Sequence, residues 1–439
     1  MTSVKCRTGA MSPAVGLILG VALMPRAGWA EAPVVDRLWT ALTGGTPEFS
    51  LRWRYEQVDD DIQVNGLPLE QAEASTVRAT LGYRTGDFHG FGAYLEFEAI
   101  GALGIDDYHD GSGTGNSEFA TIADPEGVEV NQGYLSYRPE PRITLKAGRQ
   151  IYTHRDAPFH RYLGTVLWRQ NWQTQDAVTA AVVPLENLIV DYGYIWNVNR
   201  IFGEDAPEPL SNFESDSHIV NVKYLGLPWL HLEAYAYLLD FDNAPRFSSN
   251  TLGLRGNGTY PLSEFWSVLY TAEYAHQYDA AENTFDYSED YLLFEAGFSR
   301  KLPRYIKSIM AKFSYEKLGG SGRRNGAFVT ILGTNHAFQG WADRFIVTPN
   351  SGVEDYYVTG VAQLAWDMKF IISYHDLNSD AGSFDYGTEL DLELTKSFMQ
   401  HYVVGTKAAF YDADPGPRNT AGPPSADATI VWVWAEMKF

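Results

Sequence analysis

Cysteine is nearly absent from this sequence: the chain of 439 residues has one, Cys6. It falls in an N-terminal segment with the pattern of a secretory signal, which has a basic start at Lys5, an apolar stretch over 13–24 and a small residue at Ala30. We predict that residues 1–30 are a signal peptide, cleaved after Ala30. The mature chain then has no thiol, which excludes disulfides, cysteine–zinc sites and thiol nucleophiles.

Long apolar runs and basic residues are also scarce. A membrane-spanning helix needs about 20 apolar residues, and no segment of the chain comes close to that length. A membrane role must therefore use strands. Lys and Arg number 33 against 55 Asp and Glu, which gives a formal net charge of −22 at pH 7. This acidity argues against nucleic acid as a partner, because phosphate repels it. Aromatic residues make up 14% of the chain, a content typical of the interfacial girdles of membrane barrels.

What the sequence has instead is alternation of apolar and polar residues with a period of two, which indicates strands. In 230–236 the even positions are apolar, and in 388–394 leucine alternates with polar and acidic residues. The chain ends in such a segment, with an apolar stripe that runs to the aromatic residue Phe439, as outer-membrane barrels usually end. We predict about eighteen strands, near 47–59, 73–87, 89–102, 128–139, 142–150, 173–184, 187–197, 214–226, 229–240, 249–260, 264–278, 288–300, 305–317, 353–366, 368–377, 384–396, 398–411 and 426–439.

The connections between these segments alternate between short and long. Short ones such as 227–228 and 302–304 alternate along the chain with long ones such as 151–172 and 318–352. Short periplasmic turns and long extracellular loops are the barrel pattern, and a sheet in lipid must close on itself because lipid offers no hydrogen bonds. We therefore predict an all-β transmembrane β-barrel of about 18 antiparallel strands. Residues 31–439 would form this single domain in the outer membrane of a Gram-negative bacterium, among its lipid and lipopolysaccharide.

The same alternation assigns side chains to two sides of the barrel wall. Apolar stripes such as Leu390, Leu392 and Leu394 face lipid, and the opposite faces line the lumen with charges of both signs. Such charges can select a solute by its sign. The alternative, which we favour for any single residue, is that they form salt-bridge ladders between neighbouring strands. The lumen cations that we select as pore or substrate contacts are Arg52, Arg54, Arg78, Lys146, Arg255 and Lys312.

Two long loops carry motifs. The first has G-R-Q at 148–150 and W-R-Q-N-W-Q-T-Q-D-A at 168–177, and the second has G-W-A-D-R-F at 340–345. Together these motifs resemble those of the alginate export family of outer-membrane channels. In that family the same stretches stand in the same order along the chain.

The resemblance implies an eighteen-stranded barrel that exports a polyuronate through an arginine-lined constriction, with periplasmic export-complex proteins as partners. Arginine suits this role because its planar guanidinium pairs with carboxylates through two hydrogen bonds. On this resemblance the candidate substrate contacts are Arg149, Arg155, Arg161 and Arg169, with Asp176 as an orienting partner, and Asp343 and Arg344 in the later loop.

The leading hypothesis is a passive outer-membrane channel that exports an anionic polysaccharide, alginate or an alginate-like polyuronate. The alternative is a substrate-selective or general uptake porin for small anionic or polar solutes. An enzyme is disfavoured, because no Gly-x-Ser-x-Gly motif is present. No cofactor is expected. Asp106, Asp107 and Asp110 loosely resemble a calcium loop, but Ser117 stands where the closing glutamate is needed, so calcium at the extracellular loops is kept only as an alternative.

Overall fold

The computed structural model describes residues 34–113, 116–414 and 423–439, so the proposed signal peptide lies outside the described residues. The described chain has an α-helix, α2 (Val34–Thr43), and short 3₁₀ turns at Pro245–Phe247, Asn335–Ala337, Ala365–Asp367 and Pro423–Ser425. The strands are β1 (Thr46–Asp60), β2 (Gln63–Val64), β3 (Leu67–Pro68), β4 (Ala72–Arg84), β5 (Phe91–Asp107), β6 (Gly127–Glu140), β7 (Ile143–Gln150), β8 (Thr174–Leu185), β9 (Leu188–Asn199), β10 (Asn212–Leu227), β11 (Leu230–Leu239), β12 (Ser249–Pro261), β13 (Trp266–Asp279), β14 (Ser288–Lys301), β15 (Ile306–Leu318), β16 (Val353–Leu364), β17 (Met368–Asn378), β18 (Asp385–Phe398), β19 (Tyr402–Ala413) and β20 (Ala428–Lys438).

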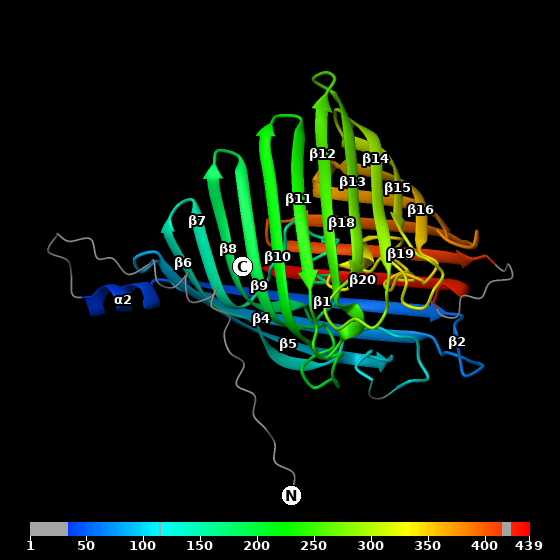
Figure 1. The fold of residues 1–439 in the computed structure, drawn as a ribbon, viewed down its shortest axis with the longest axis horizontal. Coiled ribbons are helices and arrows are strands. Elements are labelled where there is room, and N and C mark those ends of the chain that lie inside the picture. The colour runs from blue at the N-terminus through cyan, green and yellow to red at the C-terminus, as the bar shows by residue number, and fades with distance from the viewer. Residues whose placement is uncertain (1–33, 114–115, 415–422) are drawn as a thin grey trace, which may run out of the picture.

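All strands except β2 and β3 form one 18-stranded sheet that closes on itself, because β1 pairs with both β4 and β20. Every neighbouring pair is antiparallel, and Arg52 on β1 stands opposite Arg78 on one side and Glu436 on the other. The predicted all-β barrel with 18 antiparallel strands is therefore confirmed. In Figure 1 the strands of the front wall cross those of the back wall, β1, β4 and β5, as the tilt of barrel strands requires.

Two local elements were not predicted. Residues 34–43, before the first expected strand, form the helix α2. The loop after β1 contains a small hairpin of β2 and β3, joined by Asn65 and Gly66 with φ of 54° and 79°. Asn-Gly is the dipeptide that two-residue hairpin turns favour, since both residues adopt positive φ at low cost. That signal was present in the sequence.

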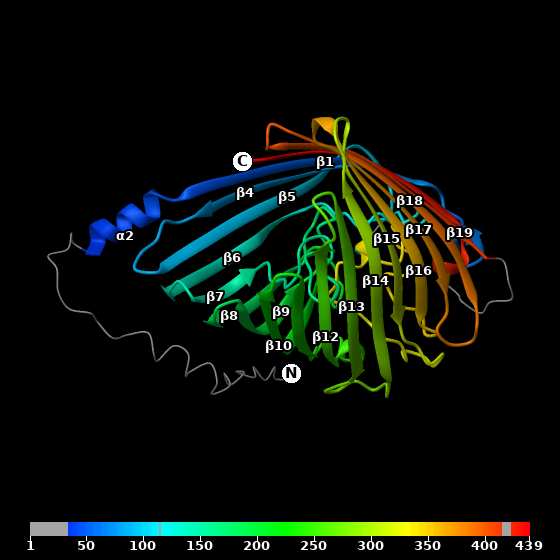
Figure 2. The ribbon, with the colours of Figure 1, turned by 90° about the horizontal axis from the view of Figure 1, so that it is seen from above.

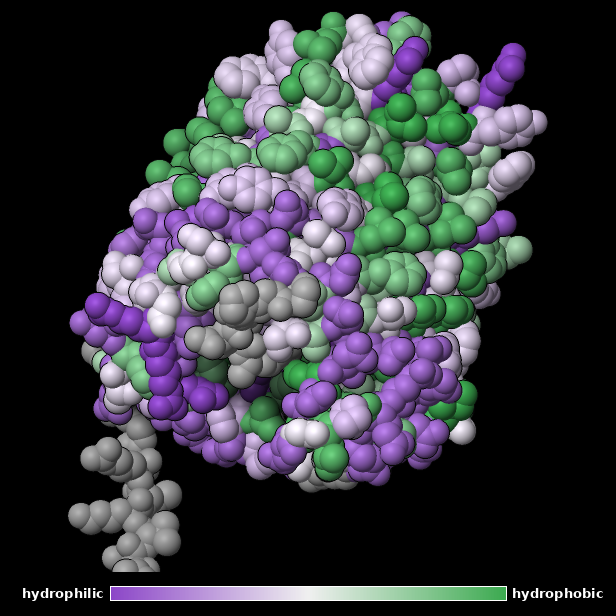
Figure 3. Space-filling model, turned by 90° about the vertical axis from the view of Figure 1, so that its right-hand side faces the viewer, coloured by the Kyte–Doolittle hydropathy of each residue, from purple (hydrophilic) through white to green (hydrophobic). Residues whose placement is uncertain are grey.

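The alternation of strand residues sorts side chains between lipid and lumen as expected. Leu254 and Phe294 face outward and are 65% and 50% exposed, whereas Glu233 and Glu273 face inward and are buried. On the last strand Val433 is exposed on the outside. In Figure 3 apolar side chains cover much of the outer wall, and polar side chains gather toward one end. Among the described residues no helix is both long enough and apolar enough to cross a membrane.

The connections are short at one end of the barrel and long at the other. Two of the long ones turn inward: the first inner loop, 151–173, follows β7, and the second inner loop, 319–352, follows β15. Figure 2 shows both in the space between the wall of β1, β4 and β5 and the wall of β9 to β13. Their place inside the lumen makes them the elements that position the site.

Candidate functional site

The two inner loops form one body inside the barrel, because they bond to each other through their backbones. The amide of Gly164 donates to the carbonyl of Leu332, and the amide of Thr334 donates to the carbonyl of His160, both at 2.8 Å. The side chain of Gln173 donates to two carbonyls, one in each loop. These loops come from strands far apart in the sequence, so their pairing fixes a single obstruction across the lumen.

A chain of buried charges ties this body to the wall at β1. Arg169 of the first inner loop lies 3.2 Å from Glu56 on β1 and 3.1 Å from Asp343 of the second inner loop. Glu56 also pairs with Arg54 at 3.2 Å, and Arg54 in turn contacts Asp124 of the loop after β5. Arg54 is 1% exposed and Arg169 is 7% exposed. Charges taken this far out of water are stable only when paired, and each member here has a partner of opposite sign.

This series of buried polar contacts continues through His336 to the barrel wall at β19. The Nδ1 atom of His336 lies 2.8 Å from a carboxylate oxygen of Asp343, and its Nε2 atom lies 2.8 Å from the ammonium group of Lys407. Burial lowers the pKa of His336 to about 3, and the charge of Lys407 acts in the same direction. Burial alone would raise the pKa of Asp343, but His336 and Arg169 outweigh it and lower that pKa to about 2. At neutral pH His336 is therefore neutral and donates to an ionised Asp343.

Aromatic rings pack around the same cations. The ring of Trp168 stacks on His336 with centroids 4.8 Å apart, and the Nζ atom of Lys407 lies 3.7 Å from the ring centre of Trp341. Trp432 from the last strand packs edge-on against Trp168. Cation–π contacts of this kind stabilise most when they are desolvated. This aromatic cage therefore holds both inner loops against the seam of the barrel, where the last strand β20 pairs with the first strand β1.

The opposite side of the inner body is held by a second group of ion pairs. Arg161 lies 2.8 Å from Glu316 on β15, and Arg155 lies 2.6 Å from Glu273 on β13. Burial would lower the pKa of both guanidinium groups, but these carboxylates raise the pKa of each above its ordinary value. Glu273 also accepts from Arg255 on β12. Both inner-loop arginines stay charged and anchored to the wall.

The predicted cluster of Arg52, Arg54 and Arg78 on the first strands contacts the first inner loop. Arg52 donates to the side-chain oxygen of Gln170 at 2.9 Å and to two loop carbonyls, one of them that of Leu167 at 2.7 Å. Arg78 pairs with Glu98 and lies 3.7 Å from the ring centre of Trp172. These groups hold the loop to the wall, and a direct contact with solute stays a prediction for them.

The remaining residues selected from the sequence form ion pairs, with the exception of Lys146. Arg149 and Asp176 stand opposite each other on β7 and β8 with 3.0 Å between their charged atoms, and a role of this pair toward a solute stays a prediction. Arg344 pairs with Asp60 at 3.0 Å, and Lys312 pairs with Glu295. Lys146 has no carboxylate within ion-pair distance among the described residues, and its Nζ atom lies 4.7 Å from the ring centre of Tyr134.

Several residues of the site were not selected from the sequence. No pattern in the sequence marks Asp124, because it lies in a loop far from either motif. His336 lies only a few residues before the second motif, but a single loop histidine has no pattern. Trp432 could have been found, because the even positions of the last strand must face the lumen once the odd positions are assigned to lipid.

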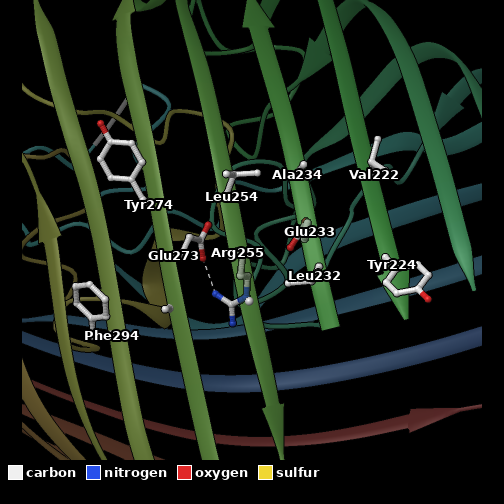
Figure 4. A pocket seen from close by; sticks show the side chains of 12 residues that line it. Val222, Tyr224, Leu232, Glu233, Ala234, Leu254, Arg255, Glu273, Tyr274 and Phe294 are labelled. Atoms are coloured by element: carbon white, nitrogen blue, oxygen red, sulfur yellow. Dashed lines mark hydrogen bonds and ion pairs between the residues drawn. The ribbon is translucent and has the colours of Figure 1, made fainter. Parts of the chain in front are cut away.

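No metal centre is evident in the part of the chain that the structure describes, where no group of three or more His, Cys, Asp or Glu side chains could hold an ion. A hollow of about 580 Å³ lies on the wall of β10 to β14. Figure 4 shows Leu254 and Tyr274 at this hollow, while Arg255 and Glu273 join each other behind it. Its exposed side chains are apolar and face lipid, so the hollow is separate from the lumen site.

No family model and no curated protein matches this chain. Solved structures do match. OccAB2 of Acinetobacter baumannii is 16% identical with a TM-score of 0.68, and the match covers 91% of this chain and 99% of that one. OpdL of Pseudomonas aeruginosa is 15% identical with a TM-score of 0.63 over 91% and 99%. OccK1 (OpdK) of Pseudomonas aeruginosa is 14% identical with a TM-score of 0.64 over the same shares.

These comparisons correct the family expected from the loop motifs. The structural neighbours are Occ and Opd porins and not alginate export channels, so the resemblance to the alginate export family is wrong. The barrel count was right because alternation is a general property of such walls. In this chain the motif residues Arg169 and Arg344 hold the inner loops to β1.

Proposed function

We propose that this chain is a selective channel in the outer membrane of a Gram-negative bacterium, through which small anionic or polar solutes enter the cell. The architecture and its neighbours support the location, and the neighbours are substrate-specific uptake porins. This was the alternative hypothesis from the sequence, and it replaces the leading one.

The observation that carries the proposal is the inner body. Arg169 joins it to β1, Arg161 joins it to β15, and the two inner loops bond to each other across the space between. Because these buried ion pairs cross the lumen, we expect the passages beside them to be narrow and polar. Such passages suit a solute of a few heavy atoms, which can exchange its water for wall contacts one at a time.

The preference for anions rests on cations that keep no carboxylate partner. Lys146 on β7 and Lys369 on β17 are partly exposed, and neither pairs with a carboxylate among the described residues. A cation that is not neutralised by the wall attracts anions, and its hydration keeps binding weak enough for release. These two lysines are therefore the side chains that we expect a passing carboxylate to meet.

Uptake into proteoliposomes tests this function. We would compare a small carboxylate, its amide of the same shape, a small ammonium ion and an oligouronate. The expected order places the small carboxylate and the amide well ahead of the ammonium ion and the oligomer. Equal rates for all four, or passage of the oligouronate as fast as the small carboxylate, would refute a narrow and selective pore.

A further inference from the structure

The helix α2 that precedes the first strand has an apolar side and a polar side. At roughly 100° per residue, Val34, Val35, Leu38, Trp39 and Leu42 fall on one continuous arc. The other side carries Asp36, Thr40 and Thr43, so the division is clean over the whole helix. A surface helix of a globular protein would turn such a stripe toward a core.

This apolar side has no partner among the described residues. Val35 is 73% exposed, Trp39 is 66% exposed, and Leu38 and Leu42 are 42% and 45% exposed. The only buried residue of α2 is Ala41. Exposed apolar surface of this kind marks a contact with membrane or protein.

The position of α2 relative to the wall is fixed by hydrogen bonds to the outside of the barrel. The hydroxyl of Tyr83 on β4 donates to the carbonyl of Leu42 at 2.8 Å and accepts from the amide of Gly45 at 2.9 Å. The amide of Gly86, in the short turn after β4, donates to the carbonyl of Ala41 at 2.8 Å. Since Thr80 on the same strand faces the lumen, Tyr83 faces lipid, and the end of the helix is held on the lipid side.

The surroundings of this attachment are apolar as well. Phe49 on β1, Leu81 on β4 and Phe439 at the end of the chain are all exposed on the outer wall near the short turns. Figures 1 and 2 show α2 beyond the end of β1, alongside this rim of the barrel and away from the lumen. The apolar side of the helix therefore continues a surface that lipid already covers.

We propose that α2 lies in the plane of the periplasmic leaflet and inserts its apolar side among the lipid acyl chains. An amphipathic helix in this plane buries its apolar side roughly 5–10 Å into the boundary of head groups and chains. Lipid is the occupant because the helix is bonded to a lipid-facing tyrosine and adjoins the lipid-facing rim. The inference depends on the barrel being in the membrane and is independent of which solute passes.

Site-specific labelling of the full chain tests this placement. With Cys6 replaced by Ser, Leu38→Cys would carry an environment-sensitive dye on the apolar side, and Thr40→Cys would carry it on the polar side as the matched control. Both positions are exposed, so neither change removes a packed side chain. Single-channel currents from each labelled sample confirm that the barrel has inserted.

The expected result in phospholipid vesicles is a blue shift at position 38 with strong quenching by brominated acyl chains, and neither effect at position 40. Water-exposed emission at both positions would overturn the proposal. A blue shift at position 38 that brominated lipid does not quench, and that grows with protein density, would also overturn it in favour of a second copy of the chain.

Discussion

Replacing Arg169 with alanine should release the inner body from the seam of the barrel. The change removes the guanidinium that pairs with Glu56 on β1 and with Asp343 of the second inner loop. Two buried carboxylates then lose a partner at the same time. We expect a larger and noisier single-channel conductance, because the loops then spend more time away from the wall.

The free-energy cost of Arg169→Ala depends on the contacts that Glu56 and Asp343 retain. Loss of one partner from a buried ion pair costs about 3–5 kcal/mol. Glu56 retains Arg54 at 3.2 Å, and Asp343 retains the hydrogen bond from His336 at 2.8 Å. Both residual contacts place the cost near the lower end, at roughly 3 kcal/mol. That is a roughly hundredfold shift from the closed toward the released state.

The assay is single-channel recording in planar bilayers together with limited proteolysis of the intact barrel from the extracellular side. Arg169→Lys should fall between the wild type and Arg169→Ala, since lysine keeps the charge but cannot reach both carboxylates in a planar fork. Arg323→Ala removes an exposed arginine from the second inner loop and serves as the matched control. If Arg169→Ala shows the conductance and the protease resistance of Arg323→Ala, the buried ion pairs do not hold the loops, and the reasoning fails.

Three further results are expected. Lowering the pH from 7 to 5.5 should weaken the hold of the second inner loop by about 1 kcal/mol. The pKa of His336 is about 3 in the folded protein, so its contribution to holding the second inner loop is complete above its ordinary pKa near 6.5 and is lost as the pH falls toward 3. The measurement is single-channel conductance, which should rise reversibly at low pH in the wild type and not in His336→Gln. Lys146→Gln and Lys369→Gln should each reduce the anion preference in reversal-potential measurements without changing the stability of the barrel, and an unchanged preference in the double variant removes them as solute contacts. Leu254→Arg, at a side chain 65% exposed to lipid, should destabilise the barrel by about 2–4 kcal/mol in refolding titrations into vesicles if it lies near the bilayer midplane, and by less if it lies near an interface.

Much of the fold could be predicted because it rests on local patterns. Most strand bounds agree with the expected ranges to within a few residues. The largest error is at the end of β5, which runs to Asp107 where the end was expected at 102, and the next is at the start of β19, where Met399 and Gln400 form a turn with positive φ. The helix α2 was missed although its apolar residues recur at helical spacing, because it is only ten residues long and lies beside a signal-like segment. For the candidate site, the sequence selected residues but did not predict their contacts. The structure shows that the two motif loops come together in the lumen and that Arg149 lies beside Asp176.

The sequence by itself determined that this chain forms a barrel, which residues of each strand face lipid and which face the lumen, and where the long loops begin. Each of these follows from a period of two and from the need of a sheet in lipid to close. Only the tertiary structure decided what the lumen charges do. Arg169 meets Glu56 across 113 positions of sequence, and Arg344 meets Asp60 across 284. No local pattern encodes such pairs, because they exist only after closure of the barrel brings the inner loops and the wall within reach. That is why the sequence could select these arginines but could not show that Arg169 and Arg344 hold the inner loops to the wall.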